Sequence, residues 1–238
     1  MGGEELSTTR IILPVSQLEA EIIEGDGHSD RLLLKRNKRT DQLIPDYLAS
    51  MTKSLGAKKG VTRDDIQDLL LPDSEYLAVE IYRLNYGEIF DFRYRCSGCN
   101  KVIPGEFPLK DLPFMELASE FQGNVDPTIT LTLPRSGLSV VVGMLNGHKE
   151  ELITNQAAQS GLDLNQADYQ CLRSIDGRTE FSFEEVIRLK LRDHKAIRKA
   201  RNKLLTGYDT TIIACCGICE TKTSINMLLH KDFLLPEG

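Results

Sequence analysis

The sequence matches itself when it is shifted by 120 residues, and this internal repeat limits the fold more than any other feature. LPVSQL at 13–18 aligns with LPRSGL at 133–138, and DGHSDRL at 26–32 aligns with NGHKEEL at 146–152. The shift stays constant along nearly the whole chain, without a gap. A fixed period of this kind indicates two copies of one structural unit.

The residues that coincide are the types whose roles are hardest to fill with another residue, namely prolines, turn glycines, helix caps and cysteines. They include the pairs Leu84/Leu204, Gly87/Gly207, Cys96/Cys216, Cys99/Cys219 and Leu109/Leu229. We therefore interpret the chain as a tandem duplication. The predicted parts are an N-terminal tail at 1–9, a first half at 10–118, a connector at 119–129 and a second half at 130–238.

Each half reads as the same series of strands and helices, so the predicted class is α+β. A β-hairpin comes first, because β-branched runs bounded by Pro and Gly occupy 9–14, 18–24, 128–134 and 138–145. A helix is expected after each Gly-His pair, and a second helix near 41–55 and again near 165–175.

Two further helices complete the expected unit. Capping boxes at Thr62-x-x-Asp65 and Ser182-x-x-Glu185 open the third helix of each half. The fourth helix is expected at 73–86 and 193–206, with Gly87 and Gly207 as left-handed residues at its C-terminal end. A strand then leads into each C-x-x-C pair and another leads away from it.

The two C-x-x-C pairs carry the clearest chemical signal. Structural zinc binds four ligands in a tetrahedron, often four thiolates, and a single pair supplies only two. Two equivalent pairs brought together by the duplication would supply Cys96, Cys99, Cys216 and Cys219. The prediction is therefore one structural zinc in a ribbon-like site that joins the halves. Because such a site is closed, it indicates a structural role and not a catalytic one.

Other interpretations of these cysteines stay open. They are a redox pair, which usually needs a helix N-terminus to lower the thiol pKa, buried free thiols, and half-sites that another chain completes. Cys215 aligns with Arg95 and is therefore the spare thiol of its run, and Cys171 reads as a small buried hydrophobe. The equivalent His28 and His148 read as local hydrogen-bonding residues at helix starts, while His194 and His230 belong to no motif.

Composition and missing motifs exclude several classes of protein. The formal net charge of −6 argues against a nucleic-acid partner. Because no apolar run is long enough for a signal peptide core or a membrane span, we expect a protein of a reducing compartment without a membrane anchor. No nucleotide-binding, hydrolase or metalloprotease motif is present, so we expect neither an enzyme nor a small-molecule substrate.

Two segments resemble a known family. LPRSGLSVVVGMLNGHKEELI at 133–153 resembles the opening of the baseplate hub and hub-assembly family of T-even-like contractile-tailed bacteriophages and related injection systems. LLLPDSEYLAVEIYRLNYGEIFDFRYRCSGC at 69–99 is similar to its central helix-Tyr-Gly-strand-C-x-x-C segment. The second half departs from that pattern, with Thr206 in place of the tyrosine, and Gln17 stands where a glycine is expected.

The resemblance implies a virion structural or assembly protein of a tail baseplate, assembled in the bacterial cytoplasm and bound to hub, spike or wedge proteins. It carries the four cysteine ligands over to Cys96, Cys99, Cys216 and Cys219. The alternative hypothesis is a zinc-ribbon adaptor that binds nucleic acid or transcription machinery.

Overall fold

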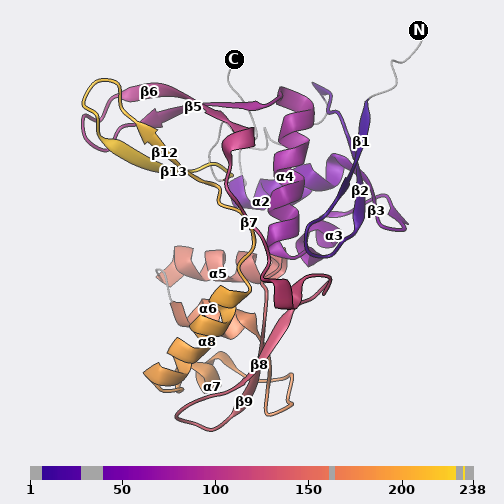
Figure 1. The fold of residues 1–238 in the computed structure, drawn as a ribbon, viewed down its shortest axis with the longest axis vertical. Coiled ribbons are helices and arrows are strands. Elements are labelled where there is room, and N and C mark those ends of the chain that lie inside the picture. Colours follow the sequence, from indigo (N-terminus) through magenta and orange to yellow (C-terminus); the bar gives the residue numbers. More distant parts are fainter. Residues whose placement is uncertain (1–6, 28–39, 161–163, 229–232, 234–238) are drawn as a thin grey trace.

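The computed structural model describes residues 7–27, 40–160, 164–228 and 233. These residues form two lobes, one above the other, that meet at a narrower waist (Figure 1). The helix expected after the first Gly-His pair falls on residues 28–39, outside the described part of the chain. No described helix has the length and apolar character needed to cross a bilayer.

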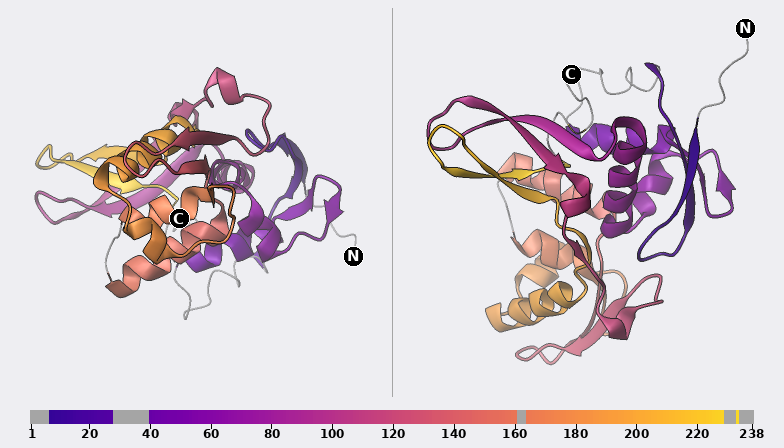
Figure 2. Two further views of the ribbon diagram at one scale, coloured as in Figure 1. Left: turned by 90° about the horizontal axis from the view of Figure 1, so that it is seen from below. Right: turned by 45° about the horizontal axis from the view of Figure 1, so that its top comes forward.

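The upper lobe holds most of the first half together with one hairpin of the second. Its elements are β1 (Thr8–Ile12), β2 (Glu19–Ile23), α2 (Thr40–Ser50), β3 (Thr52–Leu55), β4 (Lys58–Lys59), α3 (Arg63–Asp68), α4 (Leu71–Tyr86), β5 (Ile89–Arg95), β6 (Val102–Pro108), β12 (Thr211–Cys215) and β13 (Lys222–Asn226). The hairpins β5–β6 and β12–β13 project together from this lobe, as the different views of Figure 2 show.

The lower lobe comes from the second half alone. Its elements are β8 (Thr128–Thr132), β9 (Ser139–Gly143), α5 (Gly147–Ser160), α6 (Leu164–Cys171), β10 (Leu172–Ile175), α7 (Phe183–Ile187) and α8 (Leu191–Lys203). The segments at the waist are β7 (Phe114–Met115), η2 (Ser119–Phe121) and β11 (Gly207–Tyr208), while η1 (Leu109–Asp111) follows β6 on the upper lobe. The mixture of small antiparallel sheets and helices confirms the α+β class.

Both lobes build the same three-stranded sheet, to which β4 adds a fourth strand in the upper lobe. β1 pairs with β2 and β8 with β9, which confirms the two predicted hairpins. A third strand then joins each hairpin, β3 on β2 and β10 on β9. Each third strand omits one residue from the pairing, Lys53 in one lobe and Arg173 in the other. The two sheets therefore share their register and their irregularity at positions 120 residues apart.

The predicted second helix is wrong at its C-terminal end in both halves. α2 ends at Ser50 and α6 at Cys171, where 41–55 and 165–175 were expected. The following residues become β3 and β10, because pairing with a hairpin satisfies their backbone groups and buries Thr52 and Leu172. This tertiary contact outweighs the local helix pattern.

The predicted capping boxes are present at both third helices. Thr62 caps α3 and Ser182 caps α7, each with the reciprocal contact from the acid three residues later. Gly87 ends α4 with φ +88°, as predicted. The equivalent prediction for Gly207 is wrong, because α8 ends at Lys203. Gly207 begins β11 instead, with φ +100° and with Pro72 packed against it.

Each lobe has its own hydrophobic core. The upper core joins α2, α3 and α4 to the aromatic residues of β5 and to the inner face of β12–β13. The lower core joins β8, β9 and β10 to α6, α7 and α8. The upper core therefore contains residues from both predicted halves, among them Ile212, Ile225 and Met227.

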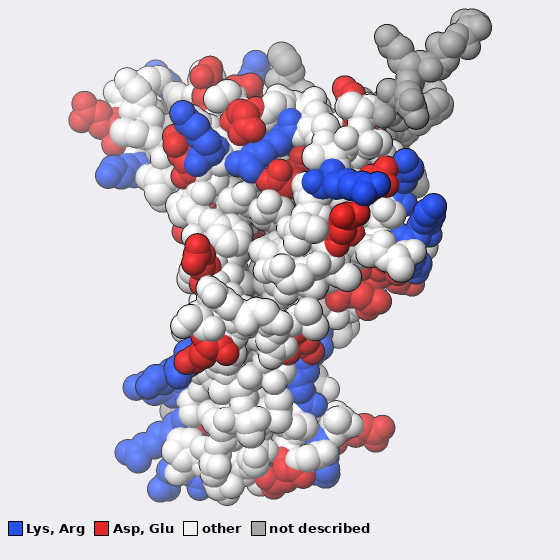
Figure 3. Space-filling model, turned by 45° about the vertical axis from the view of Figure 1, so that its right-hand side comes forward, with Lys and Arg blue, Asp and Glu red and all other residues white. Residues whose placement is uncertain are grey.

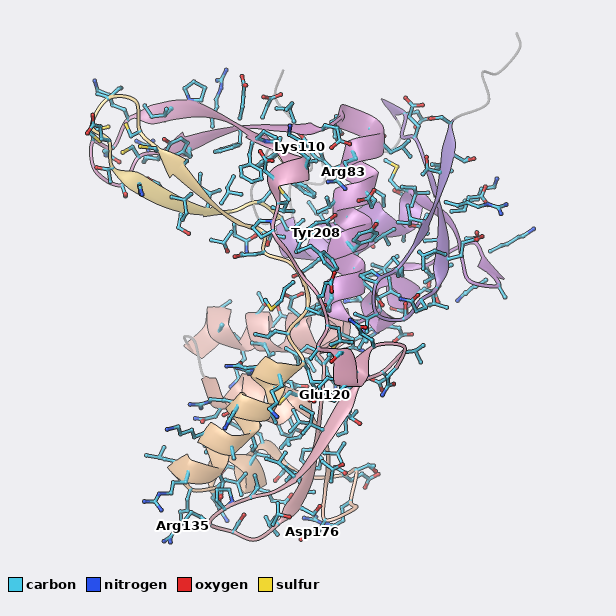
Figure 4. All side chains as sticks on the ribbon, in the orientation of Figure 1. Arg83, Lys110, Glu120, Arg135, Asp176 and Tyr208 are labelled. Atoms are coloured by element: carbon cyan, nitrogen blue, oxygen red, sulfur yellow. The ribbon has the colours of Figure 1, made fainter. Side chains whose placement is uncertain are left out.

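An aromatic cluster packs the two waist strands, β7 and β11, against α4 of the upper lobe. The rings of Tyr76 and Tyr208 stack with centroids 5.6 Å apart, and Phe114 meets Tyr208 edge to face at 5.2 Å. Figure 4 labels Tyr208 and Arg83, whose guanidinium donates to the Tyr208 hydroxyl at 3.3 Å. The short pairing of β7 with β11 passes through the same place.

A cavity of about 190 Å³ opens beside this junction, between α2, α4 and α5. Apolar and polar residues line it in equal measure, and the acidic residues Glu75, Glu150 and Glu151 are among them. Gln67 and Arg63 donate to the Glu151 carboxylate. Burial, together with the nearby charge of Glu150, raises the pKa of Glu75 to about 7.

Candidate metal centre

Two β-hairpins carry the candidate site at their tips. β5 and β6 pair from Ile89–Pro108 to Arg95–Val102, and the Cys96–Cys99 turn connects them. β12 and β13 pair from Thr211–Asn226 to Cys215–Lys222, and the Cys216–Cys219 turn connects those strands. The predicted strands on both sides of each C-x-x-C are therefore confirmed.

The two turns share one backbone conformation. Cys96 N–H donates to the Lys101 carbonyl at 2.9 Å, and Asn100 N–H donates back to the Cys96 carbonyl at 2.9 Å. Cys216 makes the corresponding pair of bonds with Thr221 and Glu220, at 3.0 and 2.9 Å. Asn100 and Glu220 both have φ +59°, the left-handed conformation that closes each turn.

The turns bring four sulfur atoms together. The Sγ atoms of Cys96 and Cys219 lie 3.5 Å apart, and those of Cys99 and Cys216 lie 3.7 Å apart. All four lie within 4.8 Å of one another. Zn–S bonds of about 2.3 Å place the sulfurs of a tetrahedral site about 3.8 Å apart. The arrangement therefore fits a tetrahedral four-thiolate metal site.

Backbone N–H groups point at one sulfur in each turn. Gly98 N–H donates to Cys96 Sγ at 3.3 Å, and Ile218 N–H donates to Cys216 Sγ at 3.4 Å. Such bonds stabilise the negative charge of a metal-bound thiolate. Gly98 is also needed sterically, because any larger residue there would collide with the Thr221 side chain, whereas Gly217 has open space around it.

The thiols differ in their acidity. The Thr221 hydroxyl lies 3.3 Å from Cys219 Sγ, and its hydrogen bond lowers the pKa of Cys219 to about 6. A bond from the Cys99 backbone N–H lowers the pKa of Cys96. At Cys99, the Lys101 backbone N–H acts in the same direction, but burial and the neighbouring thiols outweigh it and raise the pKa to about 11. A bound cation would favour the thiolate at all four positions.

The other two cysteines lie apart from this group. Cys215 is exposed at the end of β12, with its Sγ 3.6 Å from the Glu220 carbonyl. Cys171 is fully buried in the lower lobe, as its apolar surroundings predicted, and burial raises its pKa to about 12. Among the described residues, no second group of three or more potential ligands comes close enough to hold a metal ion.

Comparison with known proteins decides the family. A family model described as T4 bacteriophage base plate protein matches residues 27–226 of the chain. The chain belongs to this family. The comparisons with curated proteins and with solved structures gave no match.

Membership in the baseplate family confirms the resemblance read from the two sequence segments. It makes the chain a structural protein of a phage baseplate, which implies a location in the virion tail and contacts with other baseplate components.

The two described histidines of this baseplate protein, His148 and His194, do not belong to the sulfur cluster. His148 Nε2 lies 3.4 Å from Asp68, a residue distant in the sequence and not the local partner predicted for a helix start, while His28 and His230 lie outside the described residues. His194, which matched no motif, lies buried in the lower lobe with its Nδ1 2.9 Å from Asp168.

Sequence reasoning missed the ionic group around Asp168. This carboxylate is fully buried and accepts hydrogen bonds from Arg198 Nε at 3.1 and 2.9 Å. Arg201 lies 3.7 Å from it. Asp168 lies three residues before Cys171 in the polar helix α6, and its partners come 26 to 33 residues later, so no short motif connects them.

Proposed function

We propose that this protein is a non-enzymatic structural or assembly component of the baseplate of a contractile phage tail or phage-like injection machine, stapled by one structural zinc ion. The ligands are Cys96, Cys99, Cys216 and Cys219. The observation that carries this proposal is the close approach, within 4.8 Å, of four sulfurs from two hairpins that lie far apart in the sequence. A closed four-thiolate site leaves zinc no open position for a substrate, so its contribution is stability.

We further propose that the two hairpins descend from one ancestral unit by tandem duplication. Left-handed residues at corresponding positions support this, since they occur in the pairs Gln17/Gly137, Gly56/Asp176, Gly87/Gly207 and Asn100/Glu220. A buried aspartate also anchors the first hairpin turn in both lobes. Asp73 accepts from Val15 N–H at 2.8 Å, and Asp193 accepts from Arg135 N–H at 2.7 Å.

Duplication explains why the proposed metal site takes its ligands from two hairpins 120 residues apart in the sequence. If each copy once carried a C-x-x-C hairpin, pairing the two hairpins completes a zinc-ribbon-like site within one chain. The zinc then ties β12–β13 to the upper lobe, to which its inner face already contributes apolar side chains. Rigid attachment of this kind suits a protein that holds its shape in a large assembly.

The test is metal content per chain, measured on purified protein by elemental analysis. One zinc per chain is expected in the wild type and in Cys215→Ser, and none in Cys96→Ser or Cys216→Ser. Zinc retained in Cys96→Ser would contradict the shared site, and iron in place of zinc would correct the metal.

A second measurement separates the structural role from the adaptor alternative. Co-expression with other tail proteins should yield a stable complex, and loss of the gene should block particle assembly. Salt-dependent binding to DNA or RNA, together with normal particle assembly without the gene, would favour a zinc-ribbon adaptor instead.

A further inference from the structure

Helix α8 presents a row of cations to solvent. Arg192, Lys195, Lys199 and Lys203 follow one another at steps of three or four residues, so they lie on one face of the helix. All four are exposed. At about 1.5 Å of rise per residue the row is about 16 Å long. Figure 3 shows cationic side chains gathered along this edge of the lower lobe, and we call these four residues the α8 cationic row.

The fold itself does not account for this row. No ion pair links any of its members to an acidic side chain within the described ranges, whereas Arg198 and Arg201 of the same helix turn inward to Asp168. Like charges at these spacings destabilise a helix. The helix dipole favours a cation only near the C-terminal end, which explains Lys203 but not Arg192 or Lys195.

The matching face of α4 is covered by protein. The residues 120 positions before the α8 cationic row are Pro72, Glu75, Val79 and Arg83. Val79 is fully buried and Arg83 binds Glu80 and Tyr208, because the hairpins and β11 pack around α4. The face of α8 has no such cover from the described residues.

Apolar side chains stand at both ends of the α8 cationic row. Leu191 precedes it and is 86% exposed, and Leu205 follows it at 51% exposed. Protein interfaces combine apolar anchors with a charged rim, whereas a phosphate backbone offers nothing for two leucines to contact. The combination therefore fits an acidic protein surface better than a nucleic acid.

We propose that the α8 cationic row, with Leu191 and Leu205, binds an acidic amphipathic segment of a neighbouring protein. Carboxylates of that segment pair with the four cations, and its apolar side chains pack against the two leucines. The inference rests on the proposed role as a structural protein that contacts others, but the surface includes no cysteine of the metal centre.

The test measures binding of a synthetic probe to the full zinc-loaded chain by fluorescence anisotropy. The probe is a labelled helical peptide with glutamates at every third or fourth position and a leucine at each end. The triple variant K195E/K199E/K203E should bind it about tenfold more weakly or worse, mainly through a lower association rate. Leu191→Ser should weaken binding by speeding dissociation.

A matched control keeps the same change in net charge. Arg10, Lys59 and Lys110 are exposed and lie on the upper lobe, away from α8, and Figure 4 labels the last of them. The variant R10E/K59E/K110E should bind the peptide as the wild type does. If the triple glutamate variant of α8 fails to fold, K195Q/K199Q/K203Q replaces it, with a smaller expected loss in the same direction.

Three results would overturn the proposal: no measurable binding of the peptide, equal weakening by the control variant, or tighter binding of a DNA duplex at the same row. Zinc content is measured on every variant. Loss of zinc from the wild type would count against the metal centre and the proposed function, whereas loss of peptide binding with zinc unchanged counts only against this surface.

Discussion

The two lobes place corresponding elements in the same order but fill their interiors with different chemistry. In the lower lobe, the buried Asp168 binds Arg198 and His194. The residues 120 positions earlier are Leu48, Ala78 and Ser74, and Leu48 lies buried among apolar side chains. The same chain path therefore accommodates an apolar contact between α2 and α4 in the upper lobe and an ion network between α6 and α8 in the lower lobe.

The comparison shows which features fix the path of the chain. Capping boxes, left-handed turn residues and the buried aspartate beneath the first hairpin occur in both lobes. Most of these features supply hydrogen-bond partners for backbone N–H groups. Both lobes need such partners at the same positions because their chains follow the same path. Core side chains differ, because a core tolerates substitution when volume and polar partners are kept.

Removing the metal should give the largest difference between the lobes. A structural zinc contributes about 10–16 kcal/mol of apparent binding free energy, and all four of its proposed ligands lie on upper-lobe hairpins. We expect a chelator to abolish hydrogen-exchange protection in β5, β6, β12 and β13 while α6 and α8 keep theirs. Equal loss in both lobes would contradict a staple confined to the upper lobe.

Removing the buried carboxylate should give the next largest effect. Asp168→Ala leaves Arg198 and His194 without their partner, and we expect the free energy of unfolding of the lower lobe to fall by about 3–5 kcal/mol. The combined variant D168L/H194S/R198A copies the upper-lobe residues and should be far less destabilised. Denaturant unfolding measures both, and equal destabilisation would show that the two interiors are not interchangeable.

Glu75 should make the upper lobe sensitive to pH. Its pKa is raised to about 7 by burial and by Glu150, so the folded state holds the proton more tightly than the unfolded state does. This contribution is complete below about pH 4.5 and is lost as the pH rises through about 7. Glu75→Gln should flatten the stability profile across that window and stabilise the protein by about 1–3 kcal/mol at pH 8.

The control for this pH effect is Lys195→Gln, at the exposed corresponding position of the lower lobe. It should leave the profile of the wild type unchanged. A pH slope that survives in Glu75→Gln would assign the effect to another group.

The two capping boxes should contribute alike. Thr62→Ala and Ser182→Ala each remove the side-chain acceptor for the third helical N–H, and each should cost about 1 kcal/mol. Thermal unfolding of the two variants compares the helices directly. A cost at only one of them would show that one helix start is held by its packing instead.

Cys215→Ser should have the smallest effect. The thiol is exposed and contacts only a carbonyl among the described residues, so we expect a change within about 0.5 kcal/mol and no loss of metal. Cys216→Ser, one residue along, is the contrasting variant. If the two variants behaved alike, the assignment of Cys216, and not Cys215, as a metal ligand would be wrong.

The repeat in the sequence predicted much of this arrangement. Turn glycines, caps and cysteines report backbone requirements that are local, so the two hairpins, the capping boxes and the four-cysteine group could be read directly from them. The third strands were missed, because β3 and β10 exist only through pairing with a distant hairpin. The Asp176-Gly177 pair was a usable signal, since Asp-Gly commonly turns a hairpin.

The packing of β12–β13 into the upper core and the Asp168 network could not be predicted from the sequence, for a similar reason. Nothing in Ile212 or Ile225 identifies which of two cores they enter, because an apolar side chain fits either. Likewise, a carboxylate at position 168 can be buried only because α8 places Arg198, 30 residues later in the sequence, against it.

The packing of β12–β13 into the upper core gives the chain an order of events during synthesis. Domains generally fold as they emerge from the ribosome, the N-terminal one first. Here the lower lobe has all its core residues once Leu204 has emerged, whereas the upper core waits for Ile212, Ile225 and Met227. The lobe that begins first is thus completed last. The last of the four thiols, Cys219, emerges after the whole lower lobe, so uptake of the proposed metal would report that translation has passed that lobe.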